Sequence, residues 1–180
     1  MSYSSITELN GNKHFNFNDH NQQLFDIYSN EHNTGVPLGM PSFESTVNPL
    51  HQIQGLGPVI LKVNELPITA SILTNVFGLN IFAEYHPYED STQAIQVFKI
   101  GEGGLGGELH LYEAETEINN EDVGMIEQIE FSTQNKSEFE NAKQTLDDIG
   151  IPYQTLEQDD SDSLRITEKS GISFIYTLEK

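Results

Sequence analysis

Residues 59–78, VILKVNELPITASILTNVFG, place a strand-like run directly before a helix-like run that ends in glycine. Val59 to Val63 is apolar and rich in β-branched residues, which favours a strand. Pro67 stands at a first-turn position, where a helix has no amide hydrogen bond to lose, and Gly78 is typical of a helix end. The apolar stripe predicted for this helix consists of Ile68, Ile72, Leu73, Val76 and Phe77.

The same order returns in residues 125–150, MIEQIEFSTQNKSEFENAKQTLDDIG. Met125 to Phe131 is strand-like, and Ser137 with Glu140 forms an S-x-x-E capping box that predicts a helix start. Gly150 closes this helix as Gly78 closes the first. The positions predicted to face the core are Phe139, Ala142, Leu146 and Ile149.

Three strand-like runs follow each predicted helix. They cover residues 81–85, 94–100 and 108–112 in the first copy, and 152–156, 164–167 and 173–178 in the second. Such a repeat indicates duplicated supersecondary units. The sequence therefore predicts an α+β domain over residues 57–180, with βαβββ modules at 57–114 and 125–180.

The N-terminal part has a different pattern. His14 to Phe17 and Leu24 to Tyr28 are short β-like runs around a turn-rich tetrad, which predicts a β-hairpin arm over residues 1–32. Prolines and glycines interrupt residues 33–56, which we interpret as a linker. Because an isolated hairpin is marginal in water, the arm should dock on its own chain or on a second copy, and we favour a homodimer.

Charge and composition narrow the partners. The chain has 28 acidic and 8 basic side chains, and its net charge of -20 disfavours nucleic acid and anionic membrane surfaces. Absence of cysteine excludes disulfides and thiolate metal sites. With no apolar run long enough to cross a bilayer, the expected location is the cytoplasm.

The duplicated pattern resembles the vicinal oxygen chelate superfamily, which includes glyoxalases, bleomycin-resistance proteins and extradiol dioxygenases. Residues 33–36, 51–59 and 73–79 look more specifically like the C-terminal half of hydroquinone-type ring-cleaving dioxygenases. The resemblance implies that the two modules curl into a glyoxalase-type open barrel around a cavity. It also implies an iron or manganese site at the first and fourth strands of the modules.

The positions of those implied metal ligands are only partly filled by suitable residues. Pro58 and Ile175 stand at two of these positions and have no side-chain donor atom. His110 and Gln128 stand at two others and have side chains that can coordinate a metal. An oxygen-activating ferrous site typically uses two histidines and one carboxylate. Strand alternation brings further candidates toward the same cavity. The candidate site residues are Glu108, His110, Tyr112, Gln128 and Glu130, with His110 and Gln128 as candidate metal ligands.

Other candidate motifs have simpler interpretations. The glycine-rich residues 101–107 lack the ending of a phosphate loop and are interpreted as a flexible strand connection. The acidic residues between 157 and 163 are interpreted as a solvated loop. Most of the remaining histidines are expected to be exposed, namely His14, His20, His32, His51 and His86.

We therefore expect a glyoxalase-family domain with an incomplete metal site, which is non-catalytic or binds a small aromatic molecule. No cofactor is expected, and Fe(II) or Mn(II) would be the candidates if a metal bound. One alternative is part of a metal-dependent ring-cleaving dioxygenase that requires a missing N-terminal half. The other alternative is a scaffold or dimerisation module.

Overall fold

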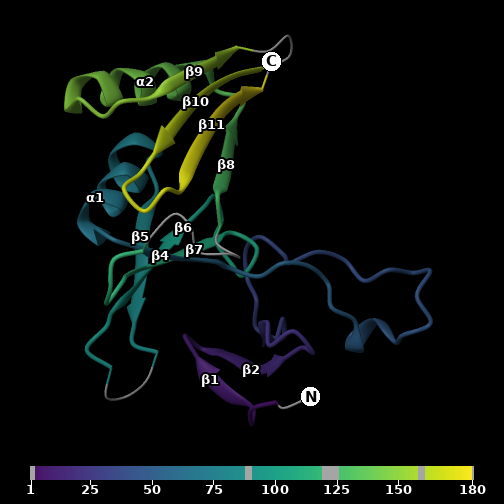
Figure 1. Ribbon diagram of the computed structural model, residues 1–180. Helices are drawn as coiled ribbons and strands as arrows, with labels where there is room; N and C mark the ends of the chain where they lie inside the picture. Colours follow the sequence, from purple (N-terminus) through teal and green to yellow (C-terminus); the bar gives the residue numbers. More distant parts are fainter. Residues whose placement is uncertain (1–2, 88–90, 119–125, 158–160, 180) are drawn as a thin grey trace. The chain divides into compact units, whose positions relative to one another are not determined.

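A computed structural model describes residues 3–87, 91–118, 126–157 and 161–179. The chain divides into two compact units, each described here by itself (Figure 1). The first unit comprises Met1–Ile60 and Phe82–His110, and the second comprises Leu61–Ile81 and Leu111–Lys180. None of the described helices is long and apolar enough to span a membrane.

The predicted hairpin is confirmed and gains a third strand. The strands β1 (Thr7–Leu9), β2 (Asn12–Asn18) and β3 (Leu24–Tyr28) form an antiparallel sheet in that order. His14 lies opposite Tyr28, and Phe15 lies opposite Ile27. Because strand side chains alternate between faces, one face of the hairpin is polar and the other is aromatic.

The first module contains β4 (Val59–Val63), α1 (Leu66–Ser71), η2 (Ile72–Val76), β5 (Asn80–Tyr85), β6 (Ile95–Lys99) and β7 (Glu108–Glu113). Its strands form a four-stranded sheet in the order β4-β7-β6-β5. The predicted helix is present, but its second part is a π-helix. Ile72, Leu73 and Val76 are buried as predicted, whereas Ile68 is 38% exposed because it lies in the first turn.

The second module contains β8 (Gln128–Thr133), α2 (Lys136–Ile149), β9 (Gln154–Glu157), β10 (Ser161–Thr167) and β11 (Ser173–Glu179). The sheet order is β8-β11-β10-β9, with β8 and β11 parallel and the other pairs antiparallel. Met125, the predicted start of its first strand, lies outside the described residues. Each module thus forms a sheet of its own, which confirms the α+β class, and the described strands close no barrel.

The start of α2 differs from the predicted capping box. The Asn135 side chain accepts hydrogen bonds from the amides of Ser137 and Glu138, and Glu138 in turn accepts one from Asn135 Nδ2 at 3.0 Å. The N-cap is therefore Asn135, two residues before the predicted Ser137, and the helix begins at Lys136, since asparagine caps as well as serine does. Ile149, predicted in the core, is 47% exposed because it is the last helical residue before Gly150.

Phe77 joins the first helix to the second sheet within the second unit. Its ring packs against Phe131, Phe174 and Tyr176, with centroids 5.0 to 6.0 Å apart. Helix α2 contributes Phe139, whose ring stacks on Tyr176 at 5.8 Å. Burial of aromatic side chains of this size is worth about 1.5–3 kcal/mol each, so this aromatic cluster is a main source of the second unit's stability.

Candidate functional site

Two buried polar atoms lack a hydrogen-bond partner among the described residues, and both belong to the first unit. They are Tyr28 Oη on β3 and Gln96 Oε1 on β6. Folded proteins almost always satisfy such atoms, because an unpaired buried polar group costs about 1–3 kcal/mol. The first unit therefore keeps unused hydrogen-bonding capacity, which is the property expected of a binding site.

Tyr28 lies in an acidic environment. Its ring stacks on His14 with the centroids 5.5 Å apart. Burial and then the negative charge of Asp26 raise the pKa of Tyr28, with smaller contributions from Tyr85, from hydrogen bonding toward the Asp26 side chain and from Glu108. Tyr28 is consequently protonated near neutral pH, and its hydroxyl group can donate a hydrogen bond. The contact with Asp26 falls short of hydrogen-bond geometry, so the Tyr28 hydroxyl keeps the capacity for another partner.

His110 occupies the centre of a second group of polar side chains in the same unit. Its side chain is 3% exposed and lies between the Tyr85 hydroxyl, 3.0 Å from Nδ1, and a Glu108 carboxylate oxygen, 3.1 Å from Nε2. A carboxylate only accepts, so Nε2 donates to Glu108, and in the neutral imidazole Nδ1 then accepts from Tyr85. This arrangement fixes the imidazole ring and draws the Tyr85 hydroxyl proton toward His110.

The side chain of His14 is also less exposed than we expected for a residue in a β-hairpin. Its Nδ1 lies 2.9 Å from an Asp26 oxygen and its Nε2 lies 3.0 Å from the Thr7 hydroxyl. Only 14% of its side chain is exposed, so it is the exception to the expectation that most of these histidines are exposed, which the other four confirm. The reason is that β2 and β3 place His14, Asp26 and Tyr28 on one face of the hairpin.

A cavity of about 760 Å³ lies beside the hairpin, within the first unit. Its walls come from the hairpin and from the segment that follows it, and they include Phe15, Phe17, Ile27 and Leu38. Asp26 and Tyr28 also line the cavity and so connect it to the polar cluster. Cavities of this size with mostly apolar walls and a few polar groups are typical small-molecule sites.

The five predicted site residues divide between the two units. Glu108 and His110 are brought together in the first unit, as described. Tyr112 belongs to the second unit, where burial raises its pKa. Gln128 is exposed on β8, and Glu130 accepts a hydrogen bond from the Thr177 hydroxyl at 2.6 Å.

The described residues do not fit the iron or manganese that the resemblance implies. They include no group of three histidine, aspartate or glutamate side chains that could hold a metal ion. Both ring nitrogens of His110 are engaged by Tyr85 and Glu108. Ile175 is buried and has no donor atom. We therefore derive no chemistry through a metal.

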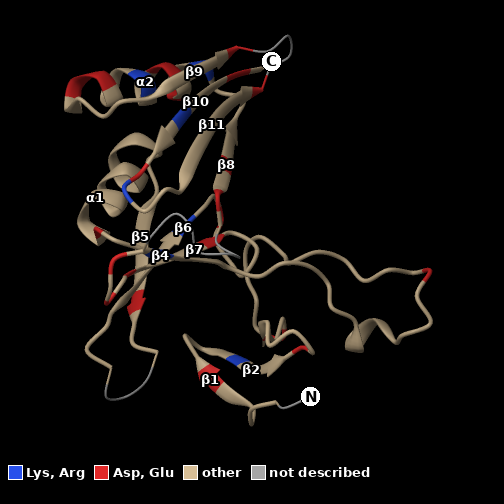
Figure 2. Ribbon diagram, in the orientation of Figure 1, with Lys and Arg blue, Asp and Glu red and all other residues tan. Residues whose placement is uncertain are grey.

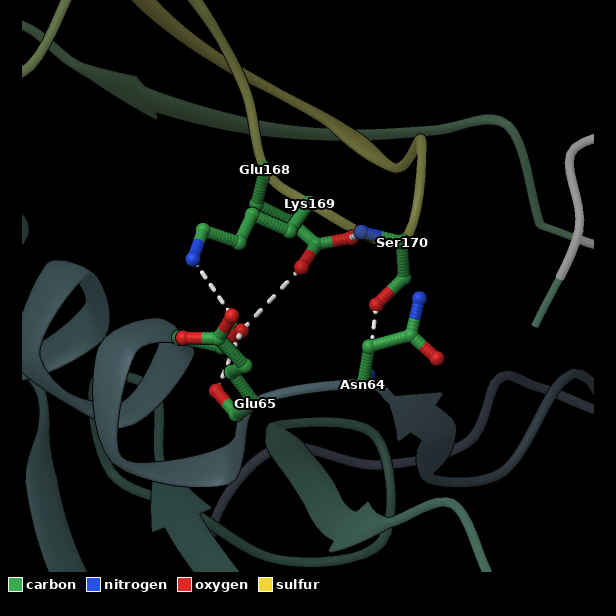
Figure 3. Close-up of polar contacts among 6 residues, drawn as sticks. Asn64, Glu65, Glu168, Lys169 and Ser170 are labelled. Atoms are coloured by element: carbon green, nitrogen blue, oxygen red, sulfur yellow. Dashed lines mark hydrogen bonds and ion pairs between the residues drawn. The ribbon is translucent and has the colours of Figure 1, made fainter. Parts of the chain in front are cut away.

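A further buried carboxylate, Glu168, belongs to the second unit and has a structural role (Figure 3). It accepts hydrogen bonds from the amides of Ser170 at 2.8 Å and Ile172 at 3.2 Å, and from the Thr69 hydroxyl at 3.2 Å. The neighbouring Lys169 pairs with Glu65. These contacts connect the turn between β10 and β11 to α1, and they leave no carboxylate oxygen without a partner.

Sequence reasoning missed Tyr28, Asp26 and Tyr85 as site residues. The alternation of polar and aromatic residues along the hairpin could have indicated a polar face that includes Asp26 and Tyr28. Tyr85 carries no such signal, because its contact with His110 joins strands that are not neighbours in the sheet.

No family model and no curated protein matches the sequence. Solved structures do match. A glyoxylase/bleomycin resistance protein/dioxygenase domain from Frankia sp. EAN1pec is 18% identical, with a TM-score of 0.56, over 72% of this chain and 100% of that one. A variant of the fosfomycin resistance protein FosX from Listeria monocytogenes, complexed with Mn(II) and 1S,2S-dihydroxypropylphosphonic acid, is 17% identical, with a TM-score of 0.55, over 72% of this chain and 95% of that one.

FosX from Mesorhizobium loti is 16% identical, with a TM-score of 0.52, over 72% of this chain and 94% of that one. Structural similarity at such low sequence identity establishes the fold. It does not transfer the chemistry of one protein to another. These similarities agree with the duplicated βαβββ modules and their two four-stranded sheets. The chain has the fold of these glyoxylase/bleomycin resistance protein/dioxygenase and fosfomycin resistance proteins.

Proposed function

We propose that this protein binds a small aromatic molecule in the cavity of its first unit and that it performs no metal-dependent chemistry. The observation that carries the proposal is the buried Tyr28 hydroxyl, which has no partner among the described residues and belongs to a residue that lines the cavity. A ligand that accepts or donates a hydrogen bond there would remove the cost of that unpaired group.

The walls and charges of the cavity define the class of ligand. Phe15, Phe17 and Ile27 offer flat apolar surfaces that suit an aromatic ring. Asp26 and Glu31 line the same cavity and would repel an anion. The proposed ligand is therefore a neutral aromatic molecule with one hydroxyl group, and its carboxylate analogue should bind poorly.

Calorimetric titration with three compounds of the same ring tests this proposal. Naphthol should bind, naphthalene should bind more weakly, and naphthoate should bind most weakly. Replacing Tyr28 with Phe should weaken naphthol binding by about tenfold, the value of one hydrogen bond, and leave naphthalene binding unchanged.

Tyr153→Phe is the matched control, because this tyrosine lies on the surface of the second unit and bonds to Asp147 there. It should leave all three affinities unchanged. Equal binding of naphthol and naphthoate, or equal loss in the two variants, would reject the proposal.

A metal-dependent ring-cleaving function is the alternative, favoured only by the enclosed Glu108 and His110 pair. It predicts that the purified protein carries near-stoichiometric iron or manganese and loses it on His110→Ala substitution. Elemental analysis of both proteins separates the alternatives. A scaffold without any ligand would give neither metal nor binding of the three compounds.

A further inference from the structure

The segment after the hairpin is an ordered loop. We call residues 38–56 the apolar loop. Its two ends meet so closely that a Cβ atom on Gly39 would overlap the carbonyl oxygen of Gln54, and one on Gly55 would overlap that of Leu38. Both glycines are thus required by this closure, which makes the segment a compact loop with adjoining ends.

Hydrogen bonds inside the loop hold its shape. The Gln52 side chain accepts from the amide of Ser42 at 2.7 Å and donates to the carbonyl oxygens of Val47, at 2.7 Å, and Ser42, at 3.1 Å. Asn48 caps the short helical turn η1 (Pro49–His51) through the amide of Leu50 at 3.0 Å. A loop that is already ordered loses less conformational entropy when a partner binds.

This ordered loop presents its large apolar side chains to solvent. Met40, Phe43, Leu50, Ile53 and Leu56 are each at least 79% exposed. At roughly 60–120 Å² of apolar area per side chain, the five offer on the order of 400 Å². A standard dimer buries about 800 Å² per copy, somewhat more than half of it apolar, so the loop could supply most of that apolar area.

Charge distinguishes between the partners that could cover this surface. Glu44 is the only Asp, Glu, Lys or Arg between Glu31 and Lys62, although the whole chain has a net charge of -20. The loop is accordingly almost without charge in Figure 2. Two copies repel each other elsewhere but not here, and the absence of Lys and Arg disfavours anionic lipid or nucleic acid.

We propose that the apolar loop is a self-association surface, which is covered by the apolar loop of a second copy of this chain around a twofold axis. Such an isologous contact needs only a surface that matches itself, and an apolar, nearly uncharged loop meets that requirement. The proposal does not depend on ligand binding in the cavity.

Light scattering of the full chain over a dilution series tests the proposal. The wild type should have the mass of two chains at high concentration and of one chain on dilution. The double substitution Phe43→Ser with Leu56→Ser should weaken the dimer by about a hundredfold, as loss of central apolar contacts does. Added salt should strengthen the wild-type dimer, because it screens the repulsion between two acidic chains.

Phe82→Ser is the matched control, since Phe82 is 63% exposed and lies outside the loop. It should leave the dimer unchanged. A wild type that is monomeric at every concentration would overturn the proposal, as would a dimer that survives the double substitution. Loop-dependent binding of the monomer to vesicles of neutral lipid would overturn it too, because the surface would then serve a membrane.

A second measurement remains decisive if the double variant fails to fold. The chain has no cysteine, so Phe43→Cys and Phe82→Cys each introduce a single thiol. Labelling of the thiol at position 43 should slow by about tenfold as protein concentration rises through the dimer transition. The thiol at position 82 should label at a constant rate. Equal behaviour of the two thiols would contradict the proposal.

Discussion

The two units treat their buried polar groups in opposite ways. In the second unit Glu168 is almost fully buried, and three donors satisfy its carboxylate. In the first unit the buried hydroxyl of Tyr28 and the amide oxygen of Gln96 have no partner among the described residues. Both situations involve burial of a polar group, which is costly unless hydrogen bonds compensate it. The second unit uses its polar group for stability, whereas we propose that the polar groups of the first unit are available to a ligand.

Removal of the Glu168 carboxylate should have the largest effect on stability. Glu168→Ala leaves the Ser170 and Ile172 amides and the Thr69 hydroxyl without an acceptor, at a total cost of about 3 kcal/mol in the free energy of unfolding. Glu140→Ala, an exposed position on α2, is the control and should change little. Urea unfolding measures both, and equal stabilities would show that the carboxylate is not structural.

Substitutions where residues 33–37 contact the glycine-rich connection, residues 101–107, should have the next largest effect on stability. The amide of Val36 donates to Gly103 O at 2.6 Å, and that of Leu105 donates to Asn33 Oδ1 at 2.7 Å, so the connection predicted to be flexible is anchored. A side chain on Gly104, where φ is +85°, would overlap the Thr34 carbonyl oxygen.

Gly104→Ala should therefore destabilise the first unit by about 2–3 kcal/mol, because a positive φ and a backbone overlap act together. Gly101→Ala is the control, since φ is also positive there but no atom lies within 4 Å of the added Cβ. It should cost about 1 kcal/mol. Similar losses in the two variants, measured by urea unfolding, would mean that close approach of the two segments is unimportant.

Tyr85→Phe should give a moderate loss. The Tyr85 hydroxyl lies 3.0 Å from Nδ1 of the enclosed His110, and its removal leaves that nitrogen without a donor. The expected cost is about 1–2 kcal/mol. His110→Gln should cost less in the Tyr85→Phe background than in the wild type, because the contact between Tyr85 and His110 is already lost there. Additive losses in a double-mutant cycle would contradict a direct interaction.

Strand and helix positions could be predicted from the sequence because they depend on local periodicity. Val59 to Val63 is the predicted strand, and Gly150 ends α2 as predicted. Ile68 and Ile149 were wrongly predicted to lie in the core. The apolar stripe of a helix does not show which of its end residues extend beyond the core. Glu108 and His110 were predicted neighbours because they are two residues apart on one strand. Tyr28 and Tyr85 were not, since only the folded unit brings β3 and β5 to the site.

High pH should produce the smallest effect on stability. The folded state raises the pKa of Tyr28 above the ordinary value of 10.0, mainly through burial. The folded protein therefore holds this proton more tightly than the unfolded chain does. The associated stability is complete below pH 10 and is lost as the pH rises above it. Tyr28→Phe should reduce this alkaline loss in urea midpoints measured at several pH values, and an unchanged loss would place the sensitive tyrosine elsewhere.

The most direct test compares Tyr28→Phe with the wild type in the absence of any ligand. A buried hydroxyl without a hydrogen-bond partner among the described residues costs free energy to bury, so its removal should leave the free energy of unfolding unchanged or raise it by up to about 1 kcal/mol. Urea unfolding near neutral pH gives this value, with Tyr85→Phe as the reference for a hydroxyl in use. A loss of stability from Tyr28→Phe equal to that from Tyr85→Phe would show that the Tyr28 hydroxyl already serves the fold, and would contradict the account.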